Sequence, residues 1–332
     1  MGDVAMIVPV LRAFSVQYPQ AKITVVSRSF FKPFFSDIEN LHFFEIDVKQ
    51  KHKGFIGLLR LFSELKQQNI THFADLHNVL RSKIVRSLFR FTGIPVAFVN
   101  KARKEKKELT RLENKIFKPL KPITERHAEV FRQLGFPIDL NQPVFPKKTI
   151  LSQEILSISG EKNVAWIGIA PFAQYDSKVY PLDLMQDVID ILANQKQYKI
   201  FLFGGGATEI IKLKQLQKQH LNVILVAGNL SFQNELALIS NLDLMVSMDS
   251  GNGHIATMLG VKVLTIWGAT HPYAGFVPFH QPIENSLIPD RNQFPGLPTS
   301  IYGNKKVANY ENAMRSIAPA KIVSSVQSLL EG

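Results

Sequence analysis

Apolar residues occur along this chain in short, β-rich runs that alternate with longer segments whose apolar residues recur at helical spacing. This alternation indicates βα units in parallel sheets, because short apolar runs bounded by turns are typical of buried strands. Strands are expected at 22–27, 42–46, 71–76 and 96–100, and then at 163–170, 199–204, 223–226, 242–246 and 261–267. The pattern therefore predicts an α/β protein with open, doubly wound sheets.

A stretch rich in proline, serine, threonine and glycine separates the two halves of the chain at 143–161. Its turn-forming residues interrupt the βα pattern, and 332 residues are enough for two domains, each with its own core. We expect an N-terminal domain over 1–155 and a C-terminal domain over 156–332. A final helix is predicted at about 319–330, where apolar residues recur at helical spacing.

The first residues predict a helix rather than a strand. Pro9 argues against a central strand over 4–11, because proline cannot donate a hydrogen bond to the ladder. Asp3 fits the N-cap of a helix, with Pro9 in its second turn, where proline costs less than in mid-helix.

Composition limits the class of protein. Hydrophobic residues make up 45% and charged residues 20%, as in an ordinary globular protein, and no apolar run approaches the ~18 residues of a membrane span. No signal peptide is expected, because the start lacks a basic region and Arg12 interrupts its apolar run. The absence of cysteine excludes disulfides, thiolate metal sites and a cysteine nucleophile, and it fits a cytoplasmic location.

The net charge of +12 is concentrated in the first half. Residues 1–150 hold 26 Lys and Arg against 13 Asp and Glu, whereas 151–332 hold 13 against 14. The densest run, 101–107, continues in basic residues to Lys121. It fits either a solvated helical face or a surface for an anionic partner: a phosphorylated glycolipid, an anionic membrane leaflet or nucleic acid. Nucleic acid is the weakest of these, because no recognised binding motif accompanies the charge.

The stretch 246–275 carries the strongest chemical signal. An apolar strand runs into Asp249, Ser250 and Gly251, a helix carries His254, and a second apolar strand ends near Thr270. This arrangement places a helix N-terminus beside the carboxyl ends of parallel strands. The first N–H groups of a helix lack intrahelical partners and its dipole is positive there, so the place suits a phosphate.

These residues resemble glycosyltransferase family 9, which includes the lipopolysaccharide heptosyltransferases. An Asp-(Ser/Thr)-Gly-x-x-His stretch followed by a strand and a Gly-x-Thr turn is characteristic of that family, and 2–13 is similar to its N-terminal Gly-Asp loop and first helix. The resemblance implies a GT-B fold, with two Rossmann-like domains facing across a cleft and the last helix crossing back to the first domain. It also implies that the first strand of the N-terminal domain is missing here.

The resemblance also assigns roles to individual residues. Asp3 corresponds to the catalytic base, although an N-cap role is the alternative. Asp249, Ser250, Gly251 and His254 correspond to the donor-binding segment, against the alternatives of a plain helix cap and a buried histidine. Further donor-binding positions are Lys178, which corresponds to a phosphate-binding lysine, Glu209, which corresponds to an acid on the nucleotide side, and Thr270, at the diphosphate.

The same alternatives apply to these further positions. Lys178 could be an ordinary surface lysine, Glu209 follows a glycine-rich turn that is weak evidence by itself, and Thr270 could lie in an ordinary turn. On the acceptor side the family uses the loop at 75–82, so His77 and Arg81 are candidates to meet an acidic sugar or phosphate. The basic stretch 107–121 is a candidate for a second acceptor contact or a membrane contact.

The implied function is an inverting glycosyltransferase that moves a sugar, heptose by resemblance, from an ADP-sugar to a lipid-linked acceptor in the inner core of lipopolysaccharide. Neither a metal nor a cofactor is expected, since no His/Asp/Glu cluster has metal-ligand spacing and the family is metal-independent. The expected location is the cytoplasm, with peripheral contact at the inner face of the inner membrane. A nucleotide-sugar epimerase and a non-catalytic glycolipid-binding protein are the alternatives.

Overall fold

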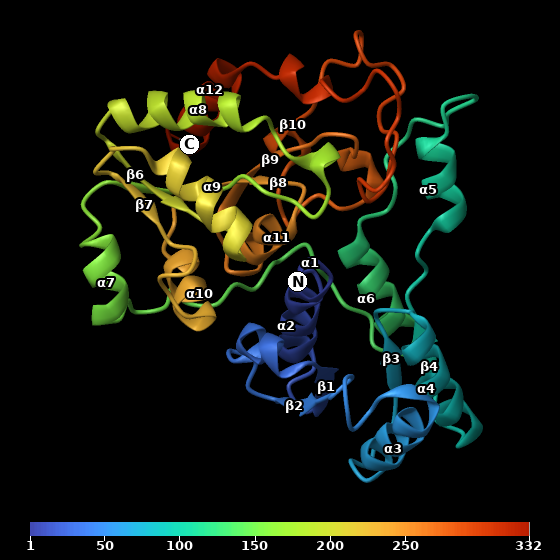
Figure 1. Ribbon diagram of the computed structural model, residues 1–332. Helices are drawn as coiled ribbons and strands as arrows, with labels where there is room; N and C mark the ends of the chain where they lie inside the picture. The colour runs from blue at the N-terminus through green and yellow to red at the C-terminus, as the bar shows by residue number, and fades with distance from the viewer. Residues whose placement is uncertain (332) are drawn as a thin grey trace. The chain divides into compact units, whose positions relative to one another are not determined.

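The computed structural model describes residues 1–331, and its chain divides into two compact units (Figure 1). The first unit consists of Met1, 3–102 and 121–145, and the second of Gly2, 103–120 and the chain from Pro146 onward. Residues 103–120 therefore pack with the second unit, although they precede the last part of the first unit in the sequence.

The second unit is built on a six-stranded, fully parallel sheet in the order β10-β9-β8-β5-β6-β7. The strands are β5 (Ala165–Ala170), β6 (Tyr198–Leu202), β7 (Val223–Leu225), β8 (Leu244–Met248), β9 (Lys262–Ile266) and β10 (Ser286–Leu287). Counted from β5, this is the doubly wound order 3-2-1-4-5-6, which reverses direction between β5 and β8. The predicted α/β class with a parallel sheet is confirmed.

The central strands β5 and β8 have buried residues on both faces, which explains why their sequences are almost continuously apolar, with Ser247 as the polar exception. They pair in register from Ile167 opposite Leu244 to Ala170 opposite Ser247. Helices cover the faces of the sheet: α7 (Gln153–Ser159), α8 (Leu182–Asn194), α9 (Ala207–Gln217), α10 (Phe232–Ser240), α11 (Gly251–Met258) and α12 (Pro319–Glu331). Short 3-10 helices η2 (Asp176–Lys178), η3 (Pro272–Ala274), η4 (Ile283–Asn285) and η5 (Ala313–Ser316) lie in the connections.

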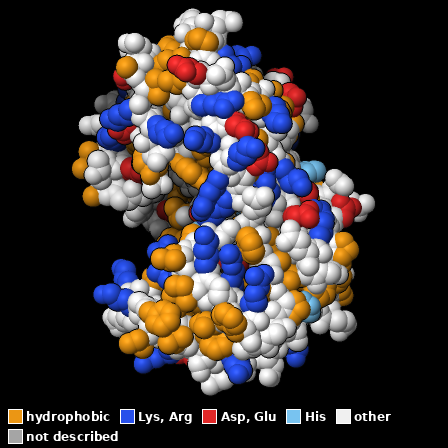
Figure 2. All heavy atoms as spheres, turned by 90° about the vertical axis from the view of Figure 1, so that its right-hand side faces the viewer, with side chains coloured by type: hydrophobic (Ala, Val, Ile, Leu, Met, Phe, Trp, Pro, Cys, Tyr) orange, Lys and Arg blue, Asp and Glu red, His pale blue; other side chains and the backbone are white. Residues whose placement is uncertain are grey.

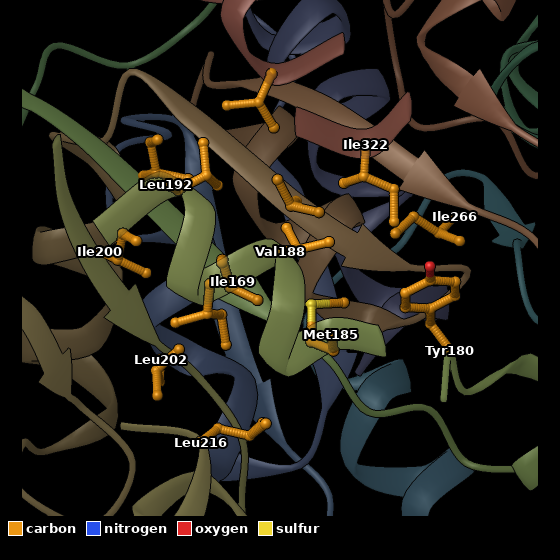
Figure 3. Close-up of a cluster of buried hydrophobic side chains, with 14 of the residues drawn as sticks. Ile169, Tyr180, Met185, Val188, Leu192, Ile200, Leu202, Leu216, Ile266 and Ile322 are labelled. Carbon is orange, nitrogen blue, oxygen red and sulfur yellow. The ribbon is translucent and has the colours of Figure 1, made fainter. Parts of the chain in front are cut away.

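The main core lies between this sheet and helices α8 and α12 (Figure 3). Met185, Val188 and Leu192 of α8 are fully buried against apolar side chains of the sheet, and Ile322 of α12 joins the same cluster. The Tyr180 hydroxyl donates a hydrogen bond of 2.6 Å to the Ile317 carbonyl and so ties the start of α8 to the start of α12. The expected final helix is confirmed, whereas its crossing to the first domain stays a prediction.

The basic segment 103–120 is held on the second unit by apolar and cation–π contacts. It contains α5 (Arg103–Thr110), and its residues Leu109 and Leu120 form a buried cluster with Ala274. The Lys106 ammonium lies over the ring of Phe276 at 4.2 Å, which accounts for the burial of a charged side chain. Figure 2 shows basic side chains gathered on the face of the second unit that carries α5.

The first unit contains two separate parallel strand pairs rather than one continuous sheet. The strands are β1 (Ile23–Ser27) with β2 (Leu41–Glu45), and β3 (Phe73–Asp75) with β4 (Val96–Phe98). Its helices are α1 (Gly2–Ala5), α2 (Val8–Gln17), the 3-10 helix η1 (Ser29–Phe35), α3 (Gly54–Lys66), α4 (Leu80–Phe91) and α6 (Ile123–Gln133). All four predicted strands are present. Three are shorter than expected, and β2 has the expected length but begins one residue earlier.

The chain start is helical, as predicted, but it is broken into two helices. Because α1 begins at Gly2, Asp3 lies inside its first turn and is not the N-cap of a continuous helix. Pro9 lies in the first turn of α2, where its missing N–H removes no intrahelical bond. The expectation that Pro9 lies in the second turn of one helix is therefore wrong, because proline favours a new helix start over an interruption.

We predict that Leu192→Ala destabilises the second unit by about 2–5 kcal/mol, because it leaves a cavity in the core between α8 and the sheet. Leu221→Ala is the matched control, since Leu221 is 96% exposed. Both tryptophans of the chain are buried in the second unit, so denaturant unfolding followed by tryptophan emission reports on this unit. Equal midpoints for the two variants would contradict the assignment of this core.

Candidate functional site

The point where the strand order reverses, between β5 and β8, is the natural binding place of this sheet. In open α/β sheets, ligands bind outside the carboxyl ends of the strands at the point where the strand order reverses, and here that point lies between β5 and β8. The loop after β5 carries Lys178 at the end of η2, and β8 is followed directly by Asp249, Ser250 and α11. The sequence-predicted donor residues thus come from both sides of the reversal.

Lys178 and Asp249 connect these two loops. The Lys178 Nζ donates to the Asp249 main-chain carbonyl at 2.5 Å and lies 3.3 Å from Asp249 Oδ2. The two side chains are only 12% and 9% exposed, so water screens their attraction less than at the surface. Lys178 is therefore not an ordinary surface lysine, and its ammonium is fixed at the carboxyl edge of the sheet.

A glycine makes room for the Lys178 side chain. Gly303 adopts a positive φ of +83°, and a Cβ there would lie 2.6 Å from Lys178 Cγ. The Ser177 hydroxyl also donates to the Gly303 carbonyl at 2.6 Å. The loop at 303 therefore supports the stem of Lys178 and directs its ammonium toward Asp249.

Ser250 and Gly251 form the N-terminal end of α11. Ser250 has extended backbone angles and is the N-cap residue, but its side chain makes no capping bond. Its Oγ is buried and has no hydrogen-bond partner among the residues that the structure describes. His254 is buried in the same helix. The Ser250 hydroxyl and the first N–H groups of α11 are thus available to oxygen atoms of a ligand.

The turn after β9 packs against the Lys178 loop. The Ala269 N–H donates to the Ser177 carbonyl at 2.9 Å, and a Cβ at Gly268 would lie only 2.1 Å from that same oxygen. Thr270 is buried, and within residues 1–331 its Oγ1 has no hydrogen-bond partner. This turn is therefore more closely fitted to the site than an ordinary surface turn.

Glu209 lies one strand further along the sheet. It is in the first turn of α9, after β6, and its Oε2 accepts a hydrogen bond of 2.8 Å from the Gly205 N–H. Gly206, at φ +81°, is the N-cap residue of this helix. The carboxylate is thus held against its own glycine-rich loop, with its second oxygen free of that bond.

A second group of chemical side chains lies in the first unit. Asp3 Oδ2 is 3.9 Å from His77 Nε2, and these side chains are 75% and 59% exposed. His127 of α6 is buried near both, and burial lowers its pKa to about 4, although the Asp3 carboxylate opposes this shift. His127 is consequently neutral near pH 7. The sequence did not indicate His127 as a site residue, because a single histidine on the apolar face of a helix is typical of an ordinary core residue.

The loop that carries His77 is fixed by Asp75. The buried Asp75 carboxylate accepts from the N–H groups of His77 and Asn78 at 3.1 and 2.6 Å and from Arg86 Nη1 at 3.0 Å. Asn78, at φ +48°, donates from its side chain to the Val99 carbonyl at 2.8 Å. This loop therefore presents His77 in a defined position, whereas Arg81 is exposed at the start of α4.

The structure thus assembles the predicted residues in two groups. Lys178, Asp249, Ser250 and Thr270 lie at the carboxyl edge of the six-stranded sheet, and Asp3 approaches His77 in the first unit. No cluster of three or more His, Asp or Glu side chains within residues 1–331 could hold a metal ion. An ammonium, a buried hydroxyl and a helix N-terminus together suit a diphosphate.

Comparisons with known proteins identify the family. Residues 58–297 match the model of glycosyltransferase family 9 (heptosyltransferase). Lipopolysaccharide heptosyltransferase 1 of Campylobacter coli is 24% identical, over 67% of this chain and 68% of that protein. The lipopolysaccharide core heptosyltransferase OpsX of Haemophilus influenzae is also 24% identical, over 82% of this chain and 77% of that protein.

Among solved structures, E. coli heptosyltransferase WaaC with ADP is similar, at a TM-score of 0.67 and 17% identity, over 100% of this chain and 95% of that chain. This likeness shows the fold and confirms the predicted GT-B class. The family model covers well over half of the chain. The chain therefore belongs to glycosyltransferase family 9, the heptosyltransferase family, and is a glycosyltransferase.

Proposed function

We propose that this protein is an inverting glycosyltransferase that transfers heptose from an ADP-sugar to a lipid-linked, anionic acceptor of the lipopolysaccharide inner core. Family membership supports the reaction class, and a structurally similar heptosyltransferase was solved with ADP. The observation that carries the proposal is the buried Lys178–Asp249 pair beside the α11 N-terminus, at the strand reversal of the sheet.

In the proposal, the donor diphosphate lies at this strand reversal. Lys178 and the first N–H groups of α11 face its negative charge, and the unpartnered hydroxyls of Ser250 and Thr270 donate to its oxygens. Asp249 accepts from hydroxyls of the sugar, and Glu209 accepts from the ribose. Gly251 and His254 belong to the same donor-binding segment. Gly251 allows the backbone to approach the ligand closely.

Departure of ADP requires relief of the charge that develops on its diphosphate. Lys178 and the helix dipole of α11 supply this relief as fixed charges, without a metal ion or a cofactor in the proposed mechanism. Fixed donors cost no reorganisation during the reaction, and removal of one such donor typically raises the barrier by about 3 kcal/mol.

Asp3 is the proposed catalytic base. Its carboxylate is exposed and lies within 4 Å of His77. In the proposal, His77 orients this carboxylate toward an acceptor hydroxyl, and Arg81 contacts an anionic group of the acceptor. Asp3 takes the proton of that hydroxyl, whose oxygen attacks the anomeric carbon while the bond to the diphosphate breaks and ADP leaves. Because the attack comes from the face opposite to the leaving group, the anomeric configuration inverts.

We predict that Asp3→Asn lowers transfer from ADP-heptose by at least about a hundredfold, because the amide cannot accept the proton. Its affinity for ADP should be unchanged, whereas Lys178→Gln should lose both transfer and ADP affinity. Thermal unfolding with ADP, UDP, GDP or dTDP in excess measures nucleotide affinity, with about 2.7 kcal/mol of stabilisation at 100 times the dissociation constant.

Asp139→Asn is the matched control for this experiment, since Asp139 is an exposed aspartate of the same unit. Transfer by Asp3→Asn at the rate of this control would remove the assigned base. Stabilisation by another nucleotide in place of ADP would retain the transferase and change its donor.

We also propose that the first unit contacts the anionic inner face of the membrane through α3. Among residues 1–331 no helix is both long and apolar enough to span a bilayer. However, α3 exposes Phe55 at 62% and Ile56 at 77%, with Leu59 one turn further on. Lys53 and Arg60 are exposed beside them. Figure 2 shows apolar side chains on this face of the first unit.

This combination fits a membrane surface better than a water-exposed helix. Aromatic and aliphatic side chains gain free energy when they enter the interfacial region, and each basic residue near an anionic leaflet adds roughly 1 kcal/mol. The α3 helix also packs against α4, the helix that follows the His77 loop. The proposed acceptor is a lipid-linked sugar, so such contact would keep the first unit where its substrate is.

We predict that the double variant Phe55→Ser/Ile56→Ser loses flotation with vesicles that contain phosphatidylglycerol, while wild type floats with these vesicles and not with pure phosphatidylcholine. Ile150→Ser/Leu221→Ser is the control, because both residues are more than 90% exposed and lie in the second unit. Equal flotation of the two double variants would contradict the α3 contact.

A further inference from the structure

Three basic side chains meet at a place that the proposed donor site does not use. Lys115 comes from the basic segment, His271 from the turn after β9, and Arg291 from the chain after β10. Lys115 Nζ donates to the Pro298 carbonyl at 2.7 Å, and Arg291 Nε donates to the adjacent Leu297 carbonyl at 3.2 Å. Bonds to two consecutive carbonyls place these cations close together.

The ring of Phe117 connects them to His271. The Arg291 guanidinium lies over this ring at 3.6 Å, and the ring centroids of Phe117 and His271 are 5.0 Å apart. The N–H groups of Thr299 and Ser300 both donate to the Ala269 carbonyl, which ties the stretch around Pro298 to the turn that carries His271. Hydrogen bonds and ring contacts therefore fix the cluster from three directions.

His271 offers a buried donor that has no acceptor among the described residues. Its Nδ1 accepts from the Tyr273 N–H at 3.1 Å, so the neutral ring carries its hydrogen on Nε2. Burial, helped by Arg291 and Lys115, lowers the pKa of His271 to about 4, so the ring is neutral near pH 7. His271 is only 4% exposed, and its Nε2 has no partner in the described part of the chain. An unpaired buried donor is costly, and an acceptor oxygen of a ligand at this position would remove that cost.

Among the described residues, the two cations also lack a counter-charge. Neither Lys115 nor Arg291 forms an ion pair with a carboxylate within residues 1–331. Burial, together with the charge of Arg291, lowers the pKa of Lys115 to about 8. Lys115 donates to two carbonyls and keeps a third N–H, and the outer nitrogens of Arg291 remain. Hydrogen bonds to neutral carbonyls would hold the loop without the charges of Lys115 and Arg291. An anion, in contrast, would accept hydrogen bonds from Lys115, Arg291 and His271.

We propose that Lys115, His271 and Arg291 form an anion pocket that holds an acidic group, a carboxylate or a phosphate, of the sugar acceptor. This inference rests on the proposed function. The donor diphosphate already has Lys178 and the α11 N-terminus at the reversal between β5 and β8. The His271 turn follows β9, one strand beyond β8, so the pocket lies beside the diphosphate position.

The pocket also gives a specific use to part of the basic segment. The planar guanidinium of Arg291 matches the two oxygens of a carboxylate or phosphate, and Lys115 adds a point charge. The acceptor would thus be selected by its acid as well as by the hydroxyl that reacts. A neutral sugar in the same position would leave the charges and the His271 N–H unpaired, which gives discrimination against neutral acceptors.

Titration of the full-length protein with inorganic phosphate, and separately with glucuronate, in the presence of saturating ADP tests this proposal. The NMR signals of the His271 ring, assigned with His271→Asn, are the readout. We expect saturable shifts with at least one of the two anions. Arg291→Gln and Lys115→Gln should each weaken this binding by about tenfold or more, because each removes a charged donor.

Lys118→Gln, an exposed lysine of the same segment, should bind like wild type. Unchanged tryptophan emission and ADP affinity in all variants show that they are folded. If ADP displaces the phosphate, the pocket belongs to the donor and the proposal is overturned. Equal anion affinity of Arg291→Gln and wild type, or the absence of any shift, would also overturn it. The anion titrations are repeated without ADP. If ADP itself fails to bind, the proposed function is refuted, whereas the titrations without ADP still test the pocket.

Discussion

The site in the second unit depends on one interaction, the pairing of Lys178 with Asp249. The two residues come from loops that leave β5 and β8 on opposite sides of the strand reversal, and their attraction brings these loops together over the ends of the strands. Removing the lysine would leave a largely buried carboxylate without its cation, at the place where a diphosphate has to be bound. The pair therefore links the order of the strands to the chemistry of the site.

The remaining parts of the second unit are arranged around this pair. Gly303 accommodates the stem of Lys178, and the turn after β9 packs on the Ser177 carbonyl, so both loops have little freedom. The basic segment 103–120 packs against that same turn through the Leu120 N–H and the Tyr273 carbonyl. Positive charge that the sequence places in the first half of the chain is thus partly built into the unit that holds the proposed donor site.

Most of the second unit was predictable from the sequence, because its longer strands are largely apolar runs separated by glycine-containing turns. Asp249, Ser250 and Gly251 could be located for the same reason, since they follow directly after such a strand. Three features could not be predicted. The helix break before Pro9 depends on local competition between helix starts. The packing of 103–120 with the second unit depends on contacts such as that of Lys106 with Phe276. The position of His127 beside Asp3 depends on the folding of segments that are distant in the sequence. All three depend on distances between residues in space, which the spacing of apolar residues along the sequence does not give.

Hydrogen exchange of the full-length protein with and without ADP tests the central claim, that the nucleotide diphosphate lies at the strand reversal of the second unit. We expect slower exchange in 171–180 and 249–258, which are the loop after β5 and helix α11 with the two residues before it. No change is expected at the opposite edge of the sheet, in 239–243 and 259–262. Slower exchange at that opposite edge, or in the first unit alone, would contradict this claim.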